Sequence, residues 1–386
     1  MVVRRWSLVM LSLIASACWA EPYHLGISVS ADWAARPLTD MIKMGPPAWQ
    51  INGGWDKPAP LDINGWPTTD CEYYLFDPNF SGPMFTMKGT YRMTFNGRAE
   101  VSMRFGGGTV QSNTYSSATN TSTVMWNITQ DRPLIWLRFA NTRRTNTSAT
   151  NTGVTNIKMM RPTTLGGTTT YPPDSVFTQE YLEAHRRGHV LRFMDFTATN
   201  GTIQRTWSDR PLLGDPTYHH YKSSGYGWQG RGMPWELAID LCNAVDRDMW
   251  LNVPMLADDN YVVQLARLVK QRLEPERKLY VEFSNEPWNF SFVQWGQMLQ
   301  MAKDEVATGN SNLNYDGTTF DGDWAVRFWA RRIMQISDLF RNEFGQDQMM
   351  TRVRPLFETQ NVWQTWISRG LTFLDRYYNN GDGAHV

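Results

Sequence analysis

The run from Val281 to Asn289, which reads Val-Glu-Phe-Ser-Asn-Glu-Pro-Trp-Asn, constrains the fold more than any other segment of the chain. Residues 278–283 are β-rich and alternating, and residues 261–273 before them carry apolar residues at helical spacing. A helix that leads directly into a strand indicates a βαβ unit. Because the strand ends in Asn-Glu-Pro, it places the carboxylate of Glu286 at the carboxyl edge of a sheet, where α/β barrels keep their functional residues.

Short apolar strands and amphipathic helices alternate along much of the chain. Strands are expected at residues 24–30, 189–196, 248–254, 278–283 and 352–358, and helices at 33–44, 234–245, 261–273, 292–306, 324–344 and 362–378. This alternation predicts a parallel sheet. With 386 residues, the chain is long enough for an α/β fold of the (β/α)8 or TIM barrel type that carries an insertion.

Residues 68–164 differ in character from the rest of the chain. Segments 89–97 and 133–139 alternate with period two, and residues 141–156 form a Thr- and Asn-rich stretch without apolar periodicity. We therefore expect an inserted antiparallel β-sandwich with a long loop. The expected division is a signal peptide at 1–20, a first βα unit at 21–67, the sandwich at 68–164 and the remainder of the barrel at 165–386.

The beginning of the chain has the composition of an export signal. Arg4 and Arg5, the apolar run 9–17 and Ala20 match its basic, apolar and small-residue sections. The apolar run is too short to span a bilayer, so a secreted or periplasmic protein is expected, with lipoprotein anchoring at Cys18 as the alternative. Cleavage after Ala20 leaves two cysteines that either pair with each other or stay buried as thiols, namely Cys71 and Cys242.

The charge balance limits the classes of partner. The chain has 37 basic and 37 acidic residues, so it offers no basic field for nucleic acid. His219 and His220 are adjacent and no Cys-x-x-Cys occurs, so the sequence predicts neither a metal site nor a cofactor. The aromatic residues are numerous, with 18 Trp, 15 Tyr and 18 Phe, which suits both core packing and stacking on sugar rings.

Taken with the strand pattern, the Asn285-Glu286-Pro287 motif resembles the glycoside hydrolases of clan A, which are barrel enzymes that cleave glycosidic bonds with retention. In that clan an Asn-Glu pair closes the fourth strand, and counting along the predicted strands places Asn285 and Glu286 there. The clan also tends to carry an arginine at the end of the second strand, which Arg192 matches. The resemblance covers roughly residues 24–67 and 165–366.

The resemblance implies that Glu286 is the general acid/base. Breaking a glycosidic bond near neutral pH requires a carboxylic acid that protonates the leaving oxygen, and burial beside Trp288 would raise the pKa of Glu286 into range. Asn285 is expected to donate to the sugar 2-hydroxyl. The other residues expected to bind substrate or to orient the acid are Arg192, Asp195 and Trp228.

A retaining enzyme needs a second carboxylate as nucleophile. By the clan's pattern it closes strand seven, but after the strand at 352–358, counted as the fifth, one helix uses most of the remaining chain. Either the chain is a fragment that lacks the last part of the barrel, which we favour, or the strand count is wrong and Glu358 is the nucleophile. A fragment should be poorly stable and inactive alone, because its strand edges are unpaired.

Each candidate residue also has an ordinary structural explanation. Glu286 could serve the start of the next helix, Arg192 and Asp195 could form a plain ion pair, and Trp228 and Trp288 could belong to the core. The protein as a whole could hold glycans without cleaving them, as a carbohydrate-binding or surface-attachment protein, or be an inactive homologue. We expect a secreted glycoside hydrolase that acts on a polysaccharide or oligosaccharide, with no nucleic acid partner and no membrane span.

Overall fold

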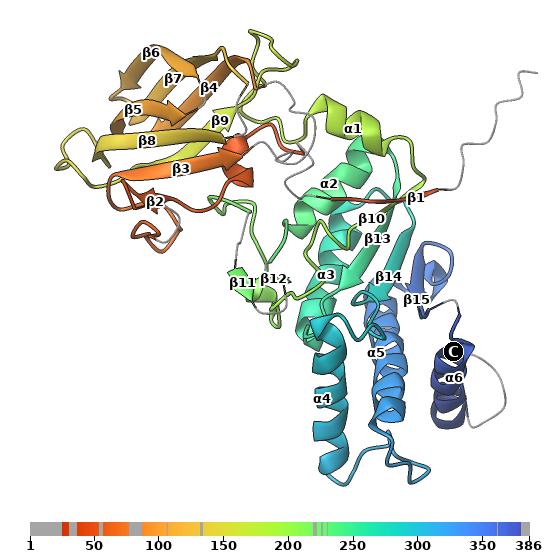
Figure 1. Ribbon diagram of the computed structural model, residues 1–386. Coiled ribbons are helices and arrows are strands. Elements are labelled where there is room, and N and C mark those ends of the chain that lie inside the picture. Colours follow the sequence, from red (N-terminus) through yellow and green to blue (C-terminus); the bar gives the residue numbers. More distant parts are fainter. Residues whose placement is uncertain are drawn as a thin grey trace, which may run out of the picture.

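The computed structural model describes residues 25–30, 37–53, 57–76, 87–105, 107–131, 134–218, 222–224, 227–229, 231–360 and 362–379. The chain forms an antiparallel β-sandwich and an α/β part with a parallel sheet (Figure 1). The expected signal at 1–20 with Cys18 lies outside the described residues, as do His219 and His220. Among the described residues, no helix is both long and apolar enough to cross a membrane.

The parallel sheet contains the five strands that the sequence predicts. In order across the sheet these are β1 (Gly26–Ser28), β10 (Val190–Arg192), β13 (Asp248–Val253), β14 (Leu279–Phe283) and β15 (Val353–Leu356). Every neighbouring pair is parallel. The order in space is the order along the chain, which differs from doubly wound sheets, where the order reverses. The predicted α/β class is confirmed, but within the described residues the sheet is open and does not close into a barrel.

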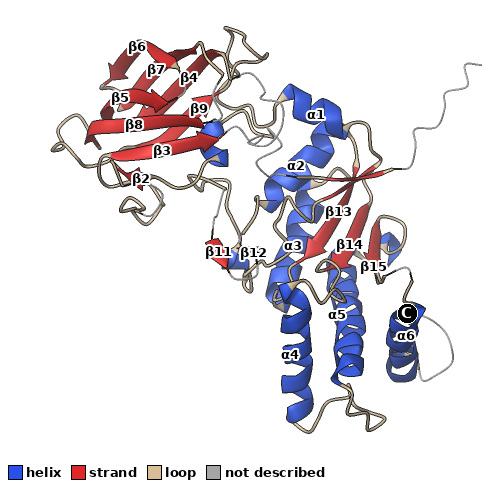
Figure 2. Cartoon of the chain, viewed as in Figure 1, coloured by secondary structure: helices blue, strands red, loops and turns tan. Residues whose placement is uncertain are grey.

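In the part of the chain that the structure describes, six α-helices accompany the parallel sheet (Figure 2). They are α1 (Gln179–His185), α2 (Trp235–Val245), α3 (Asp259–Arg272), α4 (Val293–Ala307), α5 (Asp321–Phe344) and α6 (Gln364–Tyr378), with 3-10 turns η1 (Met41–Met44), η3 (Trp207–Asp209) and η4 (Gln346–Gln348). The sequence predicts Pro234 within the first turn of α2, and the structure places it at the N-cap, one residue before that turn. Helix α3 begins two residues before the predicted start at Tyr261, and the Asp258 side chain caps it by accepting the N–H of Tyr261.

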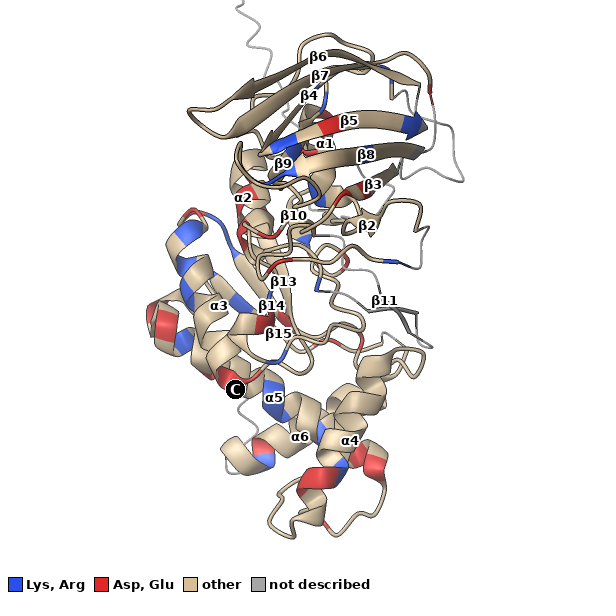
Figure 3. Cartoon of the chain, turned by 90° about the vertical axis from the view of Figure 1, so that its left-hand side faces the viewer, with Lys and Arg blue, Asp and Glu red and all other residues tan. Residues whose placement is uncertain are grey.

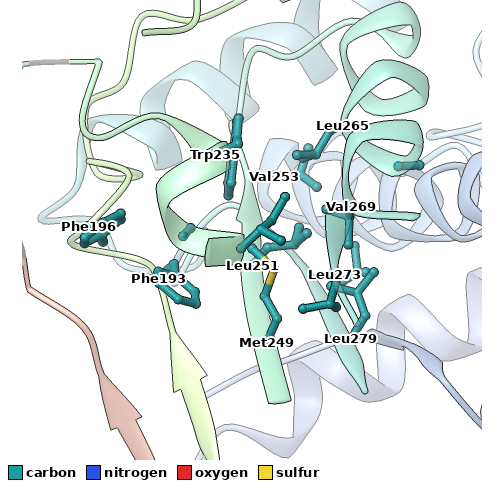
Figure 4. Packing of buried hydrophobic residues seen from close by; sticks show 14 of the residues in the cluster. Phe193, Phe196, Trp235, Met249, Leu251, Val253, Leu265, Val269, Leu273 and Leu279 are labelled. Carbon is teal, nitrogen blue, oxygen red and sulfur yellow. The ribbon is translucent and has the colours of Figure 1, made fainter. Parts of the chain in front are cut away.

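One face of the sheet packs on helices. Met249, Leu251 and Val253 alternate along β13 and join the main core with residues of α2 and α3, such as Trp235 and Leu265 (Figure 4). Alternate residues of a strand point to opposite faces. The residues between them in β13 and β14 therefore share the other face, and it is this face that carries the polar side chains of the site.

The sandwich consists of two four-stranded antiparallel sheets. One has the order β2 (Trp49–Gln50), β3 (Cys71–Phe76), β8 (Leu134–Arg143) and β5 (Arg98–Phe105); the other has β6 (Gly108–Ser116), β7 (Thr121–Ile128), β4 (Gly89–Asn96) and β9 (Thr155–Met160). Burial alternates strictly along β4 and β7. Phe95 and Trp126 from one sheet share a core with Tyr73 and Phe139 from the other, and the rings of Phe95 and Phe139 meet edge-on at 5.5 Å.

The segment expected as a first βα unit, residues 21–67, is divided between the two parts. Only β1 joins the parallel sheet, whereas Met41, Ile42 and Trp66 belong to the sandwich core. The helix expected at 33–44 is, in its described part, the 3-10 turn η1. Gly45, Pro46 and Pro47 follow it, and proline cannot continue a helix because it lacks the backbone N–H.

The chain enters and leaves the sandwich at one place. Leu38 and Phe177 form an antiparallel bridge. On either side of it, the Thr39 N–H donates to the Val176 carbonyl and the Thr178 N–H donates to the Pro37 carbonyl, both at 2.9 Å. This two-stranded neck joins the sandwich to the parallel sheet between β1 and α1.

Both cysteines of the described residues are buried free thiols. Cys71 belongs to the sandwich core and Cys242 to the core beside the parallel sheet. Of the two alternatives that the sequence leaves open, the structure shows burial and no disulfide between them.

Candidate functional site

The turn after β14 has an unusual backbone. Ser284 has φ of 62° and Glu286 has φ of 40°, so two residues with side chains adopt the left-handed conformation within three positions. This region is costly for residues other than Gly, Asn and Asp, and such strain collects at functional sites. The turn is completed by Asn289, whose backbone N–H donates to the Glu286 carbonyl and whose Nδ2 donates to Glu286 Oε2, both at 2.9 Å. The Glu286 carboxylate is thereby oriented.

Beneath this turn lies the buried carboxylate of Glu282, which is 2% exposed. Its Oε2 accepts from Asn252 Nδ2 at 2.6 Å and from Trp250 Nε1 at 2.9 Å. Asn252 Nδ2 also donates to the Ser284 carbonyl at 2.7 Å, so one amide holds both the carboxylate and the strained turn. Trp250, Asn252 and Glu282 lie on the polar face of the neighbouring strands β13 and β14, and the register of these strands pairs Asn252 with Glu282.

Arg192, at the end of β10, compensates the charge of Glu282. Its Nη2 lies 2.9 Å from Oε1 and 2.8 Å from Oε2 of that carboxylate. The same Nη2 donates to Asn285 Oδ1 at 2.8 Å, and the guanidinium lies 5.2 Å from the Trp250 ring centroid. Paired and stacked arginines of this kind are the preferred partners of buried carboxylates. Arg192 therefore links the ends of the second and fourth strands.

Asn285 is held at both ends of its side chain. Its Nδ2 donates to Asn200 Oδ1 at 3.0 Å while its Oδ1 accepts from Arg192. Gln294, from the first turn of α4, donates to the Asn285 carbonyl at 2.9 Å and also to Asn200 Oδ1. Asn285 is 2% exposed. The side chain that the sequence assigns to a sugar hydroxyl is thus used, in this structure, to fix the loop that carries Glu286.

A pocket of about 500 Å³ lies beside Glu286 at the carboxyl edge of the sheet. Two loops line it: the loop after β14 and the loop after β15. The lining residues are Glu286, Trp288, Asn289, Phe290, Thr359, Gln360 and Trp363. Two sequence-predicted residues, Glu286 and Trp288, are therefore brought together, and Trp288 also packs against Trp329 with ring centroids 5.4 Å apart.

Glu358 follows β15 and is half-buried. Burial, together with the charges of Glu282 and Glu286, raises the pKa of Glu358 to about 7, although the positive charge of Arg192 acts in the opposite direction. Burial also raises the pKa of Glu282, against its bonds to Arg192, Trp250 and Asn252. Three carboxyl groups thus share one electrostatic environment at the ends of β14 and β15.

Elsewhere, charges of both signs are interspersed over helices α3 to α6 (Figure 3).

Two sequence-predicted residues do not join this group. Asp195 is exposed in the turn after β10, and the ion pair of Arg192 is made with Glu282 rather than with Asp195. Trp228 lies on β12 (Gly227–Gln229), which pairs with β11 (Lys222–Ser224) in a separate two-stranded sheet, and its side chain is outside the described part.

Several residues of the site are not among those that the sequence predicts. Glu282 and Asn252 interrupt otherwise apolar strands, which is a visible signal for a buried polar group. Trp363, Gln360 and Asn289 lie in loops whose proximity depends on the packing of α4 and α6, and no local pattern marks them.

The described residues contain no cluster of three or more His, Cys, Asp and Glu side chains that could hold a metal ion. Comparison of the chain with protein-family models, with curated proteins and with solved structures gave no match. A functional proposal rests on the site itself.

Proposed function

We propose that this protein is a retaining glycoside hydrolase with Glu286 and Glu358 as its two carboxylates. The observation that carries the proposal is the position of Glu286, which lines a pocket of about 500 Å³ at the carboxyl edge of a parallel sheet. Aromatic and amide side chains share that pocket, and this combination suits the faces and hydroxyls of sugar rings. The polysaccharide or oligosaccharide substrate and export from the cell are parts of the same proposal.

We further propose that the parallel sheet corresponds to the first five strands of a (β/α)8 barrel. Sequential parallel order supports this assignment. It is also supported by the site: Arg192 ends the second strand and Glu286 follows the fourth, and the two are linked through Asn285. Barrel enzymes place their functional residues at this edge.

In the proposed reaction, Glu286 protonates the glycosidic oxygen while Glu358 attacks the anomeric carbon and forms a glycosyl ester. Glu286 then removes a proton from water, which hydrolyses the ester and restores both carboxylates. Arg192, Asn252 and Glu282 do not react; they hold the turn that presents Glu286.

The raised pKa of Glu358 favours a second version in which the two roles are exchanged. With a pKa of about 7, Glu358 retains its proton in mildly acid solution, as a proton donor must. The pH dependence of kcat/KM separates the two versions. A nucleophilic Glu358 makes activity rise as pH approaches 7, whereas a donating Glu358 makes activity fall above that pH.

The test of function compares the native chain with Glu286→Gln and Glu358→Gln on a panel of soluble polysaccharides, with released reducing ends as the readout. We expect each variant to lose at least about 100-fold in kcat, the usual range for removal of a general acid. Glu276→Gln, an exposed residue in the loop before β14, is the matched control and should keep full activity.

Equal hydrolysis by the native chain and Glu286→Gln would remove the assignment. Binding of glycans without hydrolysis by any of the chains would support the non-catalytic carbohydrate-binding function instead.

A further inference from the structure

Two aromatic rings in the pocket are unusually exposed. Phe290 is 59% exposed and Trp363 is 45% exposed, although each lines the pocket beside Glu286. Leaving large apolar rings in water is unfavourable, and exposed aromatic surface marks sites of interaction. These rings come from opposite loops, one after β14 and the other after β15.

Both rings rest on one aromatic cluster. Phe290 meets Trp295 of α4 edge-on at 4.7 Å, and Trp363 meets Trp366 of α6 edge-on at 5.6 Å. Trp295 and Trp366 in turn pack against each other at 5.7 Å. The cluster fixes the two loops relative to each other, so Trp363 is presented by a rigid support.

Among the described residues, the polar part of the lining has no positive charge. Besides Glu286 it consists of the amides of Asn289 and Gln360 and the hydroxyl of Thr359. Thr359 Oγ1 is buried and has no hydrogen-bond partner among the described residues. A buried hydroxyl without a partner is costly, and a ligand hydroxyl in the pocket would relieve that cost.

From these observations we propose that the pocket is a subsite for an uncharged pyranose ring, packed on Trp363 with its hydroxyls bonded to Asn289, Thr359 and Gln360. The substrate class is therefore a neutral glycan. A uronic acid unit would bring a carboxylate next to Glu286, and the described lining residues include no lysine or arginine to compensate it. This inference deepens the proposed function, because the same pocket holds the bond that Glu286 would act on.

The experiment measures binding in the Glu286→Gln chain, which keeps the ligand intact, by isothermal titration calorimetry. Probes are cellohexaose, xylohexaose and mannohexaose as neutral glycans and hexagalacturonic acid as the charged one. At least one neutral probe should bind, and the Kd of hexagalacturonic acid should be at least about tenfold higher than the Kd of that probe. Trp363→Ala should weaken the neutral probe about tenfold, which corresponds to about 1.4 kcal/mol, and Trp363→Phe should restore much of it.

Phe320→Ala is the matched control, because Phe320 is 55% exposed at the start of α5 and does not line the pocket. The proposal is overturned if no neutral probe binds, if the uronide binds as well as the neutral probe, or if Trp363→Ala and Phe320→Ala behave alike. Hydrolysis by the native chain is read separately. If the native chain hydrolyses a glycan but Trp363→Ala leaves its affinity unchanged, only the subsite proposal is removed. If binding depends on Trp363 but the native chain hydrolyses no glycan, only the proposed function is removed.

Discussion

Arg192 and Glu282 are 90 residues apart in the chain, yet Arg192 Nη2 lies within 2.9 Å of both carboxylate oxygens of Glu282. Both residues lie on the face of the sheet that carries the site. Since the same guanidinium also bonds Asn285, a change at either residue reaches the turn that presents Glu286.

Replacement of Arg192 by Met should destabilise the protein strongly. It leaves the carboxylate of Glu282 buried without a countercharge, which typically costs about 3 to 5 kcal/mol. Urea unfolding of the native chain and Arg192→Met measures the loss. The double variant Arg192→Met with Glu282→Leu should recover most of it, because both charges are then absent. A single-variant loss below about 1 kcal/mol would contradict the importance of this pair.

Glu358 should make stability depend on pH. Its pKa is about 7 in the folded protein against an ordinary value of 4.5. Between these two values the folded protein keeps a proton that the unfolded chain releases, so the free energy of unfolding decreases as pH rises through this window and levels off above it. Comparing urea unfolding of the native chain and Glu358→Gln across this range isolates the contribution. Parallel curves for the two proteins would show that Glu358 titrates normally.

The cost of the left-handed backbone at Glu286 should be measurable as a difference in the free energy of unfolding between two variants. Asparagine adopts this conformation readily and glutamine does not, so Glu286→Asn should be more stable than Glu286→Gln by roughly 1 kcal/mol while both are inactive. Met350, with φ of 63° in an exposed turn, provides the control. Met350→Asn and Met350→Gln should differ by a similar amount and keep full activity. If Glu286→Gln is the more stable of its pair, the turn is not strained.

Asn252 should be required for the geometry of the turn. Asn252→Ala removes donors from Glu282 and from the Ser284 carbonyl, and leaving buried acceptors unpaired costs about 1 to 3 kcal/mol. We expect lower thermal stability together with lower kcat. Asn260→Ala, at an exposed position in the first turn of α3, should change neither. Normal kcat in Asn252→Ala would show that the turn holds its shape without this amide.

The two cysteines of the described residues, Cys71 and Cys242, should be inert in the folded protein. Burial raises the pKa of both thiols, and each side chain is 0% exposed. A thiol reagent such as Ellman's reagent should therefore label neither Cys71 nor Cys242 until guanidinium unfolds the chain. Thr150→Cys, which places a thiol at an exposed position, should react at once and serves as the control. Rapid labelling of Cys71 or Cys242 in the native protein would place that thiol at the surface.

The parallel sheet is predictable from periodicity because its later strands β13, β14 and β15 are short β-rich runs that follow amphipathic helices. Counting these runs placed Asn285 and Glu286 after the fourth strand, which is where the structure has them. Several apolar residues between positions 41 and 66 enter the sandwich core, which the sequence does not reveal because they are scattered among prolines and glycines.

The candidate site was predictable only in part. Glu286 was marked by its motif and Arg192 by its place at a strand end. Glu282 was visible as a carboxylate within an apolar strand, but its role depends on register with Asn252, which the sequence does not show. The role of Trp363 is visible only in the fold, because Trp363 and Phe290 line the same pocket through the packing of α4 on α6 at Trp295 and Trp366.

The two-stranded neck at Leu38 and Phe177 has a consequence for how the molecule assembles. β1 must align with β10 although the whole sandwich separates them in the chain. By bringing its own ends together, the folded sandwich shortens that separation to the span of a single bridge, so the entropy lost on closing such a long loop is greatly reduced. The parallel sheet can then acquire its first strand late, as a local event, once the inserted part has already taken shape.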